Sequence, residues 1–238
     1  MKREVRRISA IMHAAGAFDR AEKSRQEDPQ VIQQPLIKKP FLGLRKVFHV
    51  LTSSVVPLLY WYLPVYVSLE ASRICVLILL LVALALFSLF DGARLLFPAL
   101  NRLVMDRFSL LIRETERNKI TGATFTCLSF LAVVFSFPRE IAVTAMLFLA
   151  LGDTAAEIAG KNWGCRKYHG RSLEGMAGFF IVAFPLAWIV MRDWPVAFVS
   201  AGMGALIEFF SIGIDDNLTV PVGSAISLWL ILSFLQKI

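Results

Sequence analysis

Two acidic residues stand in an otherwise apolar part of the chain. Asp153 and Glu157 are four residues apart, so a helix would place them one turn apart on the same face. Carboxylates inside an apolar span are costly, and they usually face a binding site or a partner charge. They therefore belong to an internal site, or they form a structural salt bridge to a cation such as Arg45 or Lys46.

A basic, glycine-spaced loop follows these acids over residues 161–174. Its cations Arg166, Lys167 and Arg171 could hold phosphate oxygens while a glycine backbone approaches closely. The alternative is that they are the ordinary positive charge of a cytoplasmic loop.

A second acidic group, Asp215 and Asp216 with Asn217, follows a later apolar run, and Glu208 lies just before it. Taken alone, the group is typical of a solvated turn, since Asp and Asn favour turns. However, carboxylates without nearby cations also suit Mg²⁺, which prefers hard oxygen ligands beside substrate phosphates.

The composition indicates which elements must position these residues. Hydrophobic residues make up 57% of the 238 residues and charged residues only 18%, against roughly half and a quarter in soluble domains. A membrane span needs about 20 apolar residues. The fold class that we predict is all-α, a polytopic membrane protein with about seven transmembrane helices. The expected spans are residues 48–67, 74–90, 122–137, 141–160, 175–191, 195–213 and 218–236.

The segment between the second and third spans, residues 91–121, is amphipathic and predicts an interfacial helix. Its apolar residues that can share one face are Leu96, Leu100, Leu103, Phe108, Leu111 and Ile112.

The distribution of Lys and Arg predicts the orientation. Residues 1–46, 91–121 and 160–174 hold 11, 6 and 4 of the 25 basic residues. The positive-inside rule then places the N-terminus in the cytoplasm and the C-terminus outside. Contact with anionic lipid accounts for the net charge of +7, so no nucleic-acid partner is expected.

Residues 1–40 differ from the remainder and predict a separate segment. They combine basic residues with apolar residues at helical spacing, which indicates a surface-lying amphipathic helix followed by a linker. A signal peptide would need a longer unbroken apolar stretch. Residues 41–238 are expected to form the membrane-embedded domain.

The soluble nucleotide-binding motifs are absent. A Walker A loop would need Gly where Ala155 stands and Ser or Thr where Asn162 stands, and no G-x-G-x-x-G turn follows a strand. Other motifs are present in a fixed order between about residues 40 and 221. They are RKVFH at 45–49, DGAR at 91–94, RETE at 113–116, TGA at 121–123, LGDTAAEIAGKNWG at 151–164, RSLEG at 171–175 and IEFFSIGIDDNLTVP at 207–221.

This pattern resembles the polyprenol and lipid-alcohol kinases, which include dolichol kinase, CTP-dependent diacylglycerol kinase and phytol kinase and are related to phosphatidate cytidylyltransferase. The resemblance implies transfer of phosphate from CTP, or another nucleoside triphosphate, to a lipid alcohol such as diacylglycerol, dolichol or phytol. It also implies a divalent cation such as Mg²⁺. The orientation predicted from the basic residues places the active site at the cytoplasmic face of the membrane, the inner or plasma membrane in a bacterium.

The resemblance also implies roles for individual residues. Catalytic roles fall to Arg45, Lys46, Asp153 and Asp216, and the metal would be held by Asp153 with Asp215 or Asp216. The implied nucleotide-binding residues are Gly152, Gly160, Gly164, Lys167, Arg171, Ser172, Glu174, Gly175 and Asn217. The family usually has Lys where this chain has Arg171, so a bidentate fork replaces a point charge.

Two other functions remain as alternatives at this point. A phosphatidate cytidylyltransferase, which makes CDP-diacylglycerol, also needs CTP, metal and basic residues. A small membrane transporter would instead predict inverted repeats with polar breaks near the middle of the membrane. The charges here gather near one face, and the sequence shows no such repeat.

Overall fold

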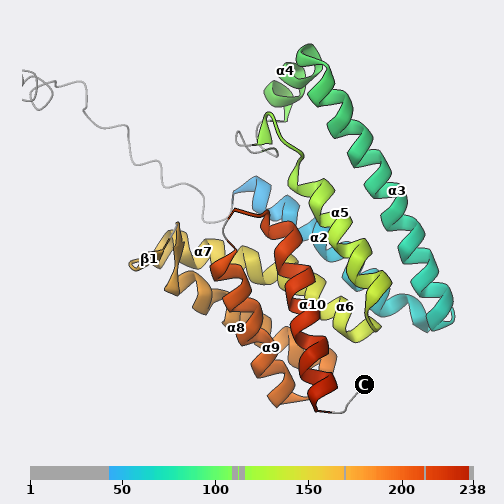
Figure 1. The fold of residues 1–238 in the computed structure, drawn as a ribbon, viewed down its shortest axis with the longest axis vertical. Coiled ribbons are helices and arrows are strands. Elements are labelled where there is room, and N and C mark those ends of the chain that lie inside the picture. Colours follow the sequence, from blue (N-terminus) through green and yellow to red (C-terminus); the bar gives the residue numbers. More distant parts are fainter. Residues whose placement is uncertain (1–42, 109–111, 113–115, 169, 212, 236–238) are drawn as a thin grey trace, which may run out of the picture. The chain divides into compact units, whose positions relative to one another are not determined.

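The computed structural model describes residues 43–108, 112, 116–168, 170–211 and 213–235 (Figure 1). The regular elements in these residues are helices and one short β-hairpin. The longer helices are α2 (Leu44–Tyr62), α3 (Leu69–Leu96), α5 (Gly122–Ser136), α8 (Leu173–Met191), α9 (Trp194–Phe210) and α10 (Asp216–Phe234). The shorter elements are the 3₁₀ turn η2 (Leu63–Val65), α4 (Pro98–Arg107), α6 (Arg139–Leu147), the π-helical turn η4 (Phe148–Asp153), α7 (Thr154–Trp163), β1 (Lys167–Tyr168) and β2 (Arg171–Ser172).

Five helical segments are long and apolar enough to cross a membrane. They are Arg45–Val65, Leu69–Leu96, Arg139–Trp163, Leu173–Met191 and Asp216–Phe234. The two other expected spans correspond to shorter apolar helices, α5 and α9. The described residues are therefore mainly helical, and their long apolar helices indicate a multi-pass membrane protein, as the composition predicts.

The continuous segment α6–η4–α7 forms the centre of the helical bundle. Every residue from 141 to 150 is buried, and α2, α5, α8 and α10 all pack against this segment (Figure 1). Small residues permit the close approach of its neighbours. A methyl group added at Gly152 would lie 2.9 Å from the ring of Phe179 on α8, so only glycine fits there.

The predicted interfacial helix is shorter than expected. Helix α3 continues to Leu96, and α4 covers only Pro98–Arg107, because Pro98 starts a new helix after an extended Phe97. Leu111 lies outside the described residues, as does the whole predicted N-terminal segment 1–40.

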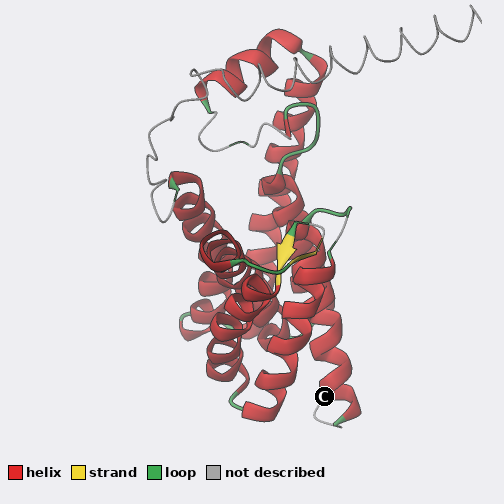
Figure 2. Cartoon of the chain, turned by 90° about the vertical axis from the view of Figure 1, so that its left-hand side faces the viewer, coloured by secondary structure: helices red, strands yellow, loops and turns green. Residues whose placement is uncertain are grey.

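The loop between α7 and α8 contains structure that the sequence did not predict. Lys167 pairs with Ser172, and Tyr168 with Arg171, in a two-stranded antiparallel hairpin (Figure 2). Gly170 has a φ of 86°, a conformation that suits glycine in a tight turn. Strand β2 leads directly into α8, so the hairpin fixes Arg171 beside the first turn of that helix.

Candidate functional site

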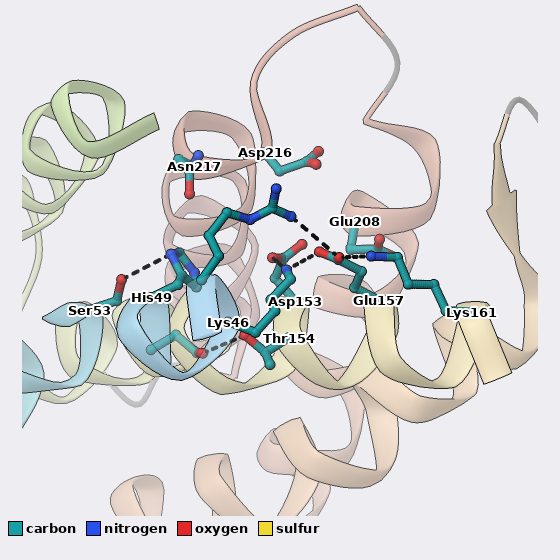
Figure 3. Close-up of polar contacts among 12 residues, drawn as sticks. Lys46, His49, Ser53, Asp153, Thr154, Glu157, Lys161, Glu208, Asp216 and Asn217 are labelled. Carbon is teal, nitrogen blue, oxygen red and sulfur yellow. Dashed lines mark hydrogen bonds and ion pairs between the residues drawn. The ribbon is translucent and has the colours of Figure 1, made fainter. Parts of the chain in front are cut away.

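The first charged cluster joins the start of α2 to the junction of η4 and α7. The buried Lys46 ammonium contacts Glu157 and lies 3.8 Å from Asp153 Oδ2 (Figure 3). Arg45 Nη2 lies 3.7 Å from Glu157 Oε1, and Lys161 contacts the same carboxylate from one turn further along α7. Two acids and three cations therefore meet where the start of α2 lies beside the junction of η4 and α7.

The π-helical turn η4 ends at Asp153. π-Helical turns are rare in proteins, but those that occur often lie at functional sites. The wider turn changes the direction of the side chains that follow it. Asp153 lies close enough to Glu157 and to Asp216 of α10 for their negative charges to act on it. The close-up shows the carboxylates of Asp153 and Glu157 close together, with Asp216 above them in this view (Figure 3).

The second charged cluster centres on Arg171 in the hairpin. Its guanidinium contacts Glu208 near the end of α9 and Asp216 in the first turn of α10. Burial lowers the pKa of Arg171, but the hydrogen bonds and charges of the two carboxylates outweigh burial and leave its pKa raised. Arg171 is therefore a permanent cation that ties three elements together.

These contacts correct one expectation. The acids at 215 and 216 were expected to lack nearby cations, but Asp216 pairs with Arg171. Helix packing brings together residues 45 positions apart, which sequence spacing does not reveal. Lys46 and Arg45 of α2 neutralise Asp153 and Glu157 through ion pairs. These are the same pairs that the alternative interpretation, a structural salt bridge, predicts.

Asp215 has a different role from Asp216. Its carboxylate caps α10 and accepts hydrogen bonds from the backbone N–H and the side-chain Nδ2 of Asn217, at 2.9 and 2.7 Å. The Asn217 carbonyl accepts a hydrogen bond of 2.6 Å from Ser129 of α5. Asp215 and Asn217 thus fix the start of α10, which places Asp216 toward Arg171.

The small residues of the motif pack around one hydroxyl. Ser172 caps α8 by accepting a hydrogen bond of 3.0 Å from Gly175 N. Methyl groups added at Gly160, Gly164 or Gly175 would lie only 3.0, 3.0 and 3.2 Å from Ser172 Oγ. These glycines therefore let α7, the loop and α8 approach one another closely, a role for the protein interior in addition to any contact with nucleotide.

The remaining predicted nucleotide-binding residues lie in different places. Lys167 is exposed on β1, where it can reach a ligand in solvent. Glu174 lies in the first turn of α8, and the backbone groups of Cys165 and Arg166 act on its carboxylate, of which Oε2 is buried without a hydrogen-bond partner among the described residues. Gly152, directly before Asp153, packs internally against the ring of Phe179.

Sequence reasoning did not include Glu208 among the site residues. The sequence could have indicated Glu208, because it is the one charged residue in the sequence of α9. An isolated acid in an apolar helix indicates a partner or a site, but its partner, Arg171, is known only from the fold.

A metal ion would find suitable oxygens here. Within the described residues, no group of three His, Cys, Asp or Glu side chains is arranged to hold an ion. Mg²⁺ is commonly held by one or two carboxylates together with substrate phosphates and water. The two neighbouring carboxylates Asp153 and Asp216 fit that arrangement, whereas Asp215 already uses an oxygen in capping α10.

Comparison with known proteins identifies relatives of the chain. It is 32% identical over 164 residues to CTP-dependent diacylglycerol kinase 1 of Schizosaccharomyces pombe, an alignment covering 60% of this chain and 74% of the relative. The protein of the same name from Eremothecium gossypii is 27% identical over 222 residues, covering 81% and 68%. Phytol kinase of Synechocystis sp. is 34% identical over 125 residues, covering 45% and 53%.

No family model matches the chain, and no solved structure matches it significantly. The relatives nevertheless share a type of activity, phosphorylation of a lipid alcohol, and the alignment with the fission-yeast kinase spans most of that enzyme. Together with the apolar helices and the clustered charges, this similarity means that the chain belongs to the membrane lipid-alcohol kinase family that includes the CTP-dependent diacylglycerol kinases.

Proposed function

We propose that this protein transfers the γ-phosphate of CTP to the hydroxyl group of a membrane lipid alcohol, with diacylglycerol as the first candidate acceptor. The two relatives named for CTP and diacylglycerol align over 60% and 81% of this chain, whereas the phytol kinase aligns over 45%. The observation that carries the proposal is the convergence of Lys46, Asp153, Arg171 and Asp216, from α2, η4, β2 and α10, at one end of the bundle.

The cations of the two clusters suit the binding of a triphosphate. Lys46 and Arg171 are held by carboxylates, so the charges of the site are close to balance without a nucleotide's own charge. A triphosphate brings new negative charge, for which these cations can supply charge-assisted hydrogen bonds. Arg45 and Lys167, at the edge of the clusters, can extend this set.

The reaction itself needs mainly positioning and charge neutralisation. The lipid hydroxyl oxygen forms a bond to the γ-phosphorus, the bond from that phosphorus to the β–γ bridging oxygen breaks, CDP departs and the hydroxyl proton is released to solvent. Asp153 and Asp216 would hold a divalent cation, which when bound neutralises charge on the phosphates. Asn217 and Ser172 keep the helix starts on either side in place.

The transfer is tested with purified protein, Mg²⁺, a panel of lipid alcohols together with phosphatidate, and CTP labelled at either the γ- or the α-phosphate. We expect γ-label in diacylglycerol-derived lipid. Incorporation of α-label into lipid, with phosphatidate as acceptor, would instead identify a cytidylyltransferase, which uses the same nucleotide and the same kinds of residue.

We propose further that the site faces the cytoplasm, as the distribution of basic residues predicts. Cys165, in the loop before the hairpin, is exposed and reports on this face. A thiol reagent that cannot cross membranes should label Cys165 only after cells are opened. A Cys165→Ser variant identifies any signal from Cys75 and Cys127, and labelling of Cys165 in intact cells would reverse the orientation.

A further inference from the structure

Glu208 is a buried acid on a helix that is otherwise uncharged. It is 5% exposed and lies two residues before the end of α9, whose other residues are apolar or small. Burying a carboxylate without a partner costs several kcal/mol. The fold compensates for this cost with Arg171.

The guanidinium of Arg171 is shared between two acids of different exposure. One terminal nitrogen, Nη1, contacts Glu208, while Nη2 contacts Asp216 and lies 3.5 Å from the Ser211 carbonyl. The side chain of Glu208 is 6% exposed, and that of Asp216 is 27% exposed. Water and ligands can therefore reach Asp216 more easily than Glu208.

The elements that carry the two acids also differ. Glu208 is inside a regular helix packed against α8, whereas Asp216 occupies the first turn of α10, after a turn in which Gly213 has a φ of 84°. A bond to a buried helical residue persists more readily than one to a residue at a solvent-accessible helix start.

We propose that Glu208 is a positioning residue for the phosphate-binding cation Arg171, and that Asp216 is the partner which Arg171 releases when nucleotide binds. Glu208 keeps one side of the guanidinium in place, so the other side can turn from Asp216 to a phosphate oxygen. Asp216 is then free to act as a ligand of the divalent cation. This inference rests on the proposed function, since it requires a nucleotide phosphate at Arg171.

A direct role for Glu208 makes a different prediction. If Glu208 itself bound a metal ion or the substrate, its removal would reduce activity whether or not Arg171 were present. If it acts through Arg171, its removal matters only while Arg171 is there. A double-mutant cycle separates the two cases, because residues that act through one interaction show non-additive effects.

The experiment uses the full chain purified in detergent and compares wild type, Glu208→Gln, Arg171→Ala and the double variant. CTP affinity is measured by equilibrium dialysis without lipid, and KM and kcat are measured with diacylglycerol. We expect Glu208→Gln to weaken CTP binding and raise KM about tenfold, with a smaller change in kcat. In the Arg171→Ala background the same substitution should change affinity less than about twofold.

Two further variants distinguish positioning from a general loss of structure. Glu208→Asp keeps the charge and should recover part of the CTP affinity. If Glu208→Gln fails to fold, Glu208→Asp is used in its place in the comparison. Glu140→Gln alters an acid of another ion pair, with Arg139 at the start of α6, and should leave CTP affinity unchanged.

Independent losses from Glu208→Gln and Arg171→Ala that multiply in the double variant would overturn the proposal. Equal losses in Glu208→Asp and Glu208→Gln would also overturn it. Failure of the proposed function has a separate signature: wild-type protein would bind CTP, and show the cycle, without phosphorylating any lipid alcohol.

Discussion

Among the described residues, two groups of charges are satisfied in different ways, and one of them is more deeply buried than the other. One is the hub of Asp91 and Arg94 at the end of α3. Asp91 Oδ2 accepts hydrogen bonds from Thr121 N, Thr121 Oγ1 and Thr124 Oγ1 at 2.8, 3.0 and 2.7 Å, and its Oδ1 pairs with Arg94 at 3.0 Å. Arg94 also donates to the carbonyls of residues 116, 117 and 119.

The other group is the candidate site. Here the partners of Asp153, Glu157 and Asp216 are cations from other elements, and these carboxylates are partly exposed. In the Asp91–Arg94 hub, hydroxyl and backbone N–H groups already donate to the carboxylate oxygens. A ligand therefore has few partners to replace there, and the hub serves to stabilise the fold. Carboxylates neutralised by cations from other elements can exchange those cations for a metal ion, and the cations can turn to a phosphate. The type of partner, rather than burial alone, separates structural charge from functional charge.

The largest expected effect tests the structural side of this comparison. Asp91→Ala leaves Arg94, which is fully buried, without its counter-charge, and breaking a buried pair in this way costs about 3–5 kcal/mol. We expect a marked loss of folded protein from the membrane and a lower thermal midpoint in detergent. The exposed Asp106→Ala in α4 is the matched control. Wild-type stability of Asp91→Ala would show that the hub does not hold the fold.

The next effect tests the functional side. Asp153→Asn removes a charge but is nearly isosteric, so packing should change little while phosphate transfer falls at least about a hundredfold, or roughly 2.7 kcal/mol. Lipid phosphorylation is measured across a range of Mg²⁺ concentrations, with Asp106→Asn as control. Near-normal activity at limiting Mg²⁺ would rule out a metal-ligand role, and loss of the protein from the membrane would favour a structural salt bridge.

A smaller effect is expected at the phosphate-binding cation. Loss of a charge-assisted contact costs about 1.5–3 kcal/mol, so Arg171→Ala should lower kcat/KM for CTP by roughly one to two orders of magnitude. Arg171→Lys should recover part of this loss, because Lys keeps the charge that the family usually carries here. A lysine variant as impaired as the alanine variant would mean that the guanidinium geometry, and not charge, is required.

The smallest effect is expected at Lys161, which pairs with Glu157 one helical turn away but has a side chain that is 69% exposed. Exposed pairs contribute little, so Lys161→Ala should change kcat/KM for CTP less than about threefold. Equal and small effects at Lys161 and Arg171 would show that the basic loop serves orientation alone, and the phosphate site would have to lie elsewhere.

Much of the architecture could be predicted from sequence because it depends on local properties. Apolar runs located the seven helical segments, with boundaries up to six residues from those observed, as for α3, since burial in lipid requires each run to be apolar along its own length. The helix starts at Ser172 and Asp215 likewise use side chains that bond to their own backbone neighbours.

The π-helical turn and the hairpin were not predicted. A widened turn at Phe148–Asp153 depends on how the central segment packs against α8, and the strands contain only two residues each. Neither leaves a periodic pattern in the sequence. The sequence shows glycine at positions 152 and 204, but it does not show why glycine is needed there. The rings of Phe179 and Phe148, which leave no room for a larger side chain, come from other helical segments.

The sequence by itself determined that this chain is a membrane protein of apolar helices, that its charges gather near the ends of several of them, and that its motifs are those of lipid-alcohol kinases. The tertiary structure decided which charges meet. Arg171 joins Glu208 and Asp216 across 37 and 45 residues, and Asp91 joins Thr121 across 30. Such pairings depend on how helices pack side by side in three dimensions, whereas composition and spacing describe each helix alone.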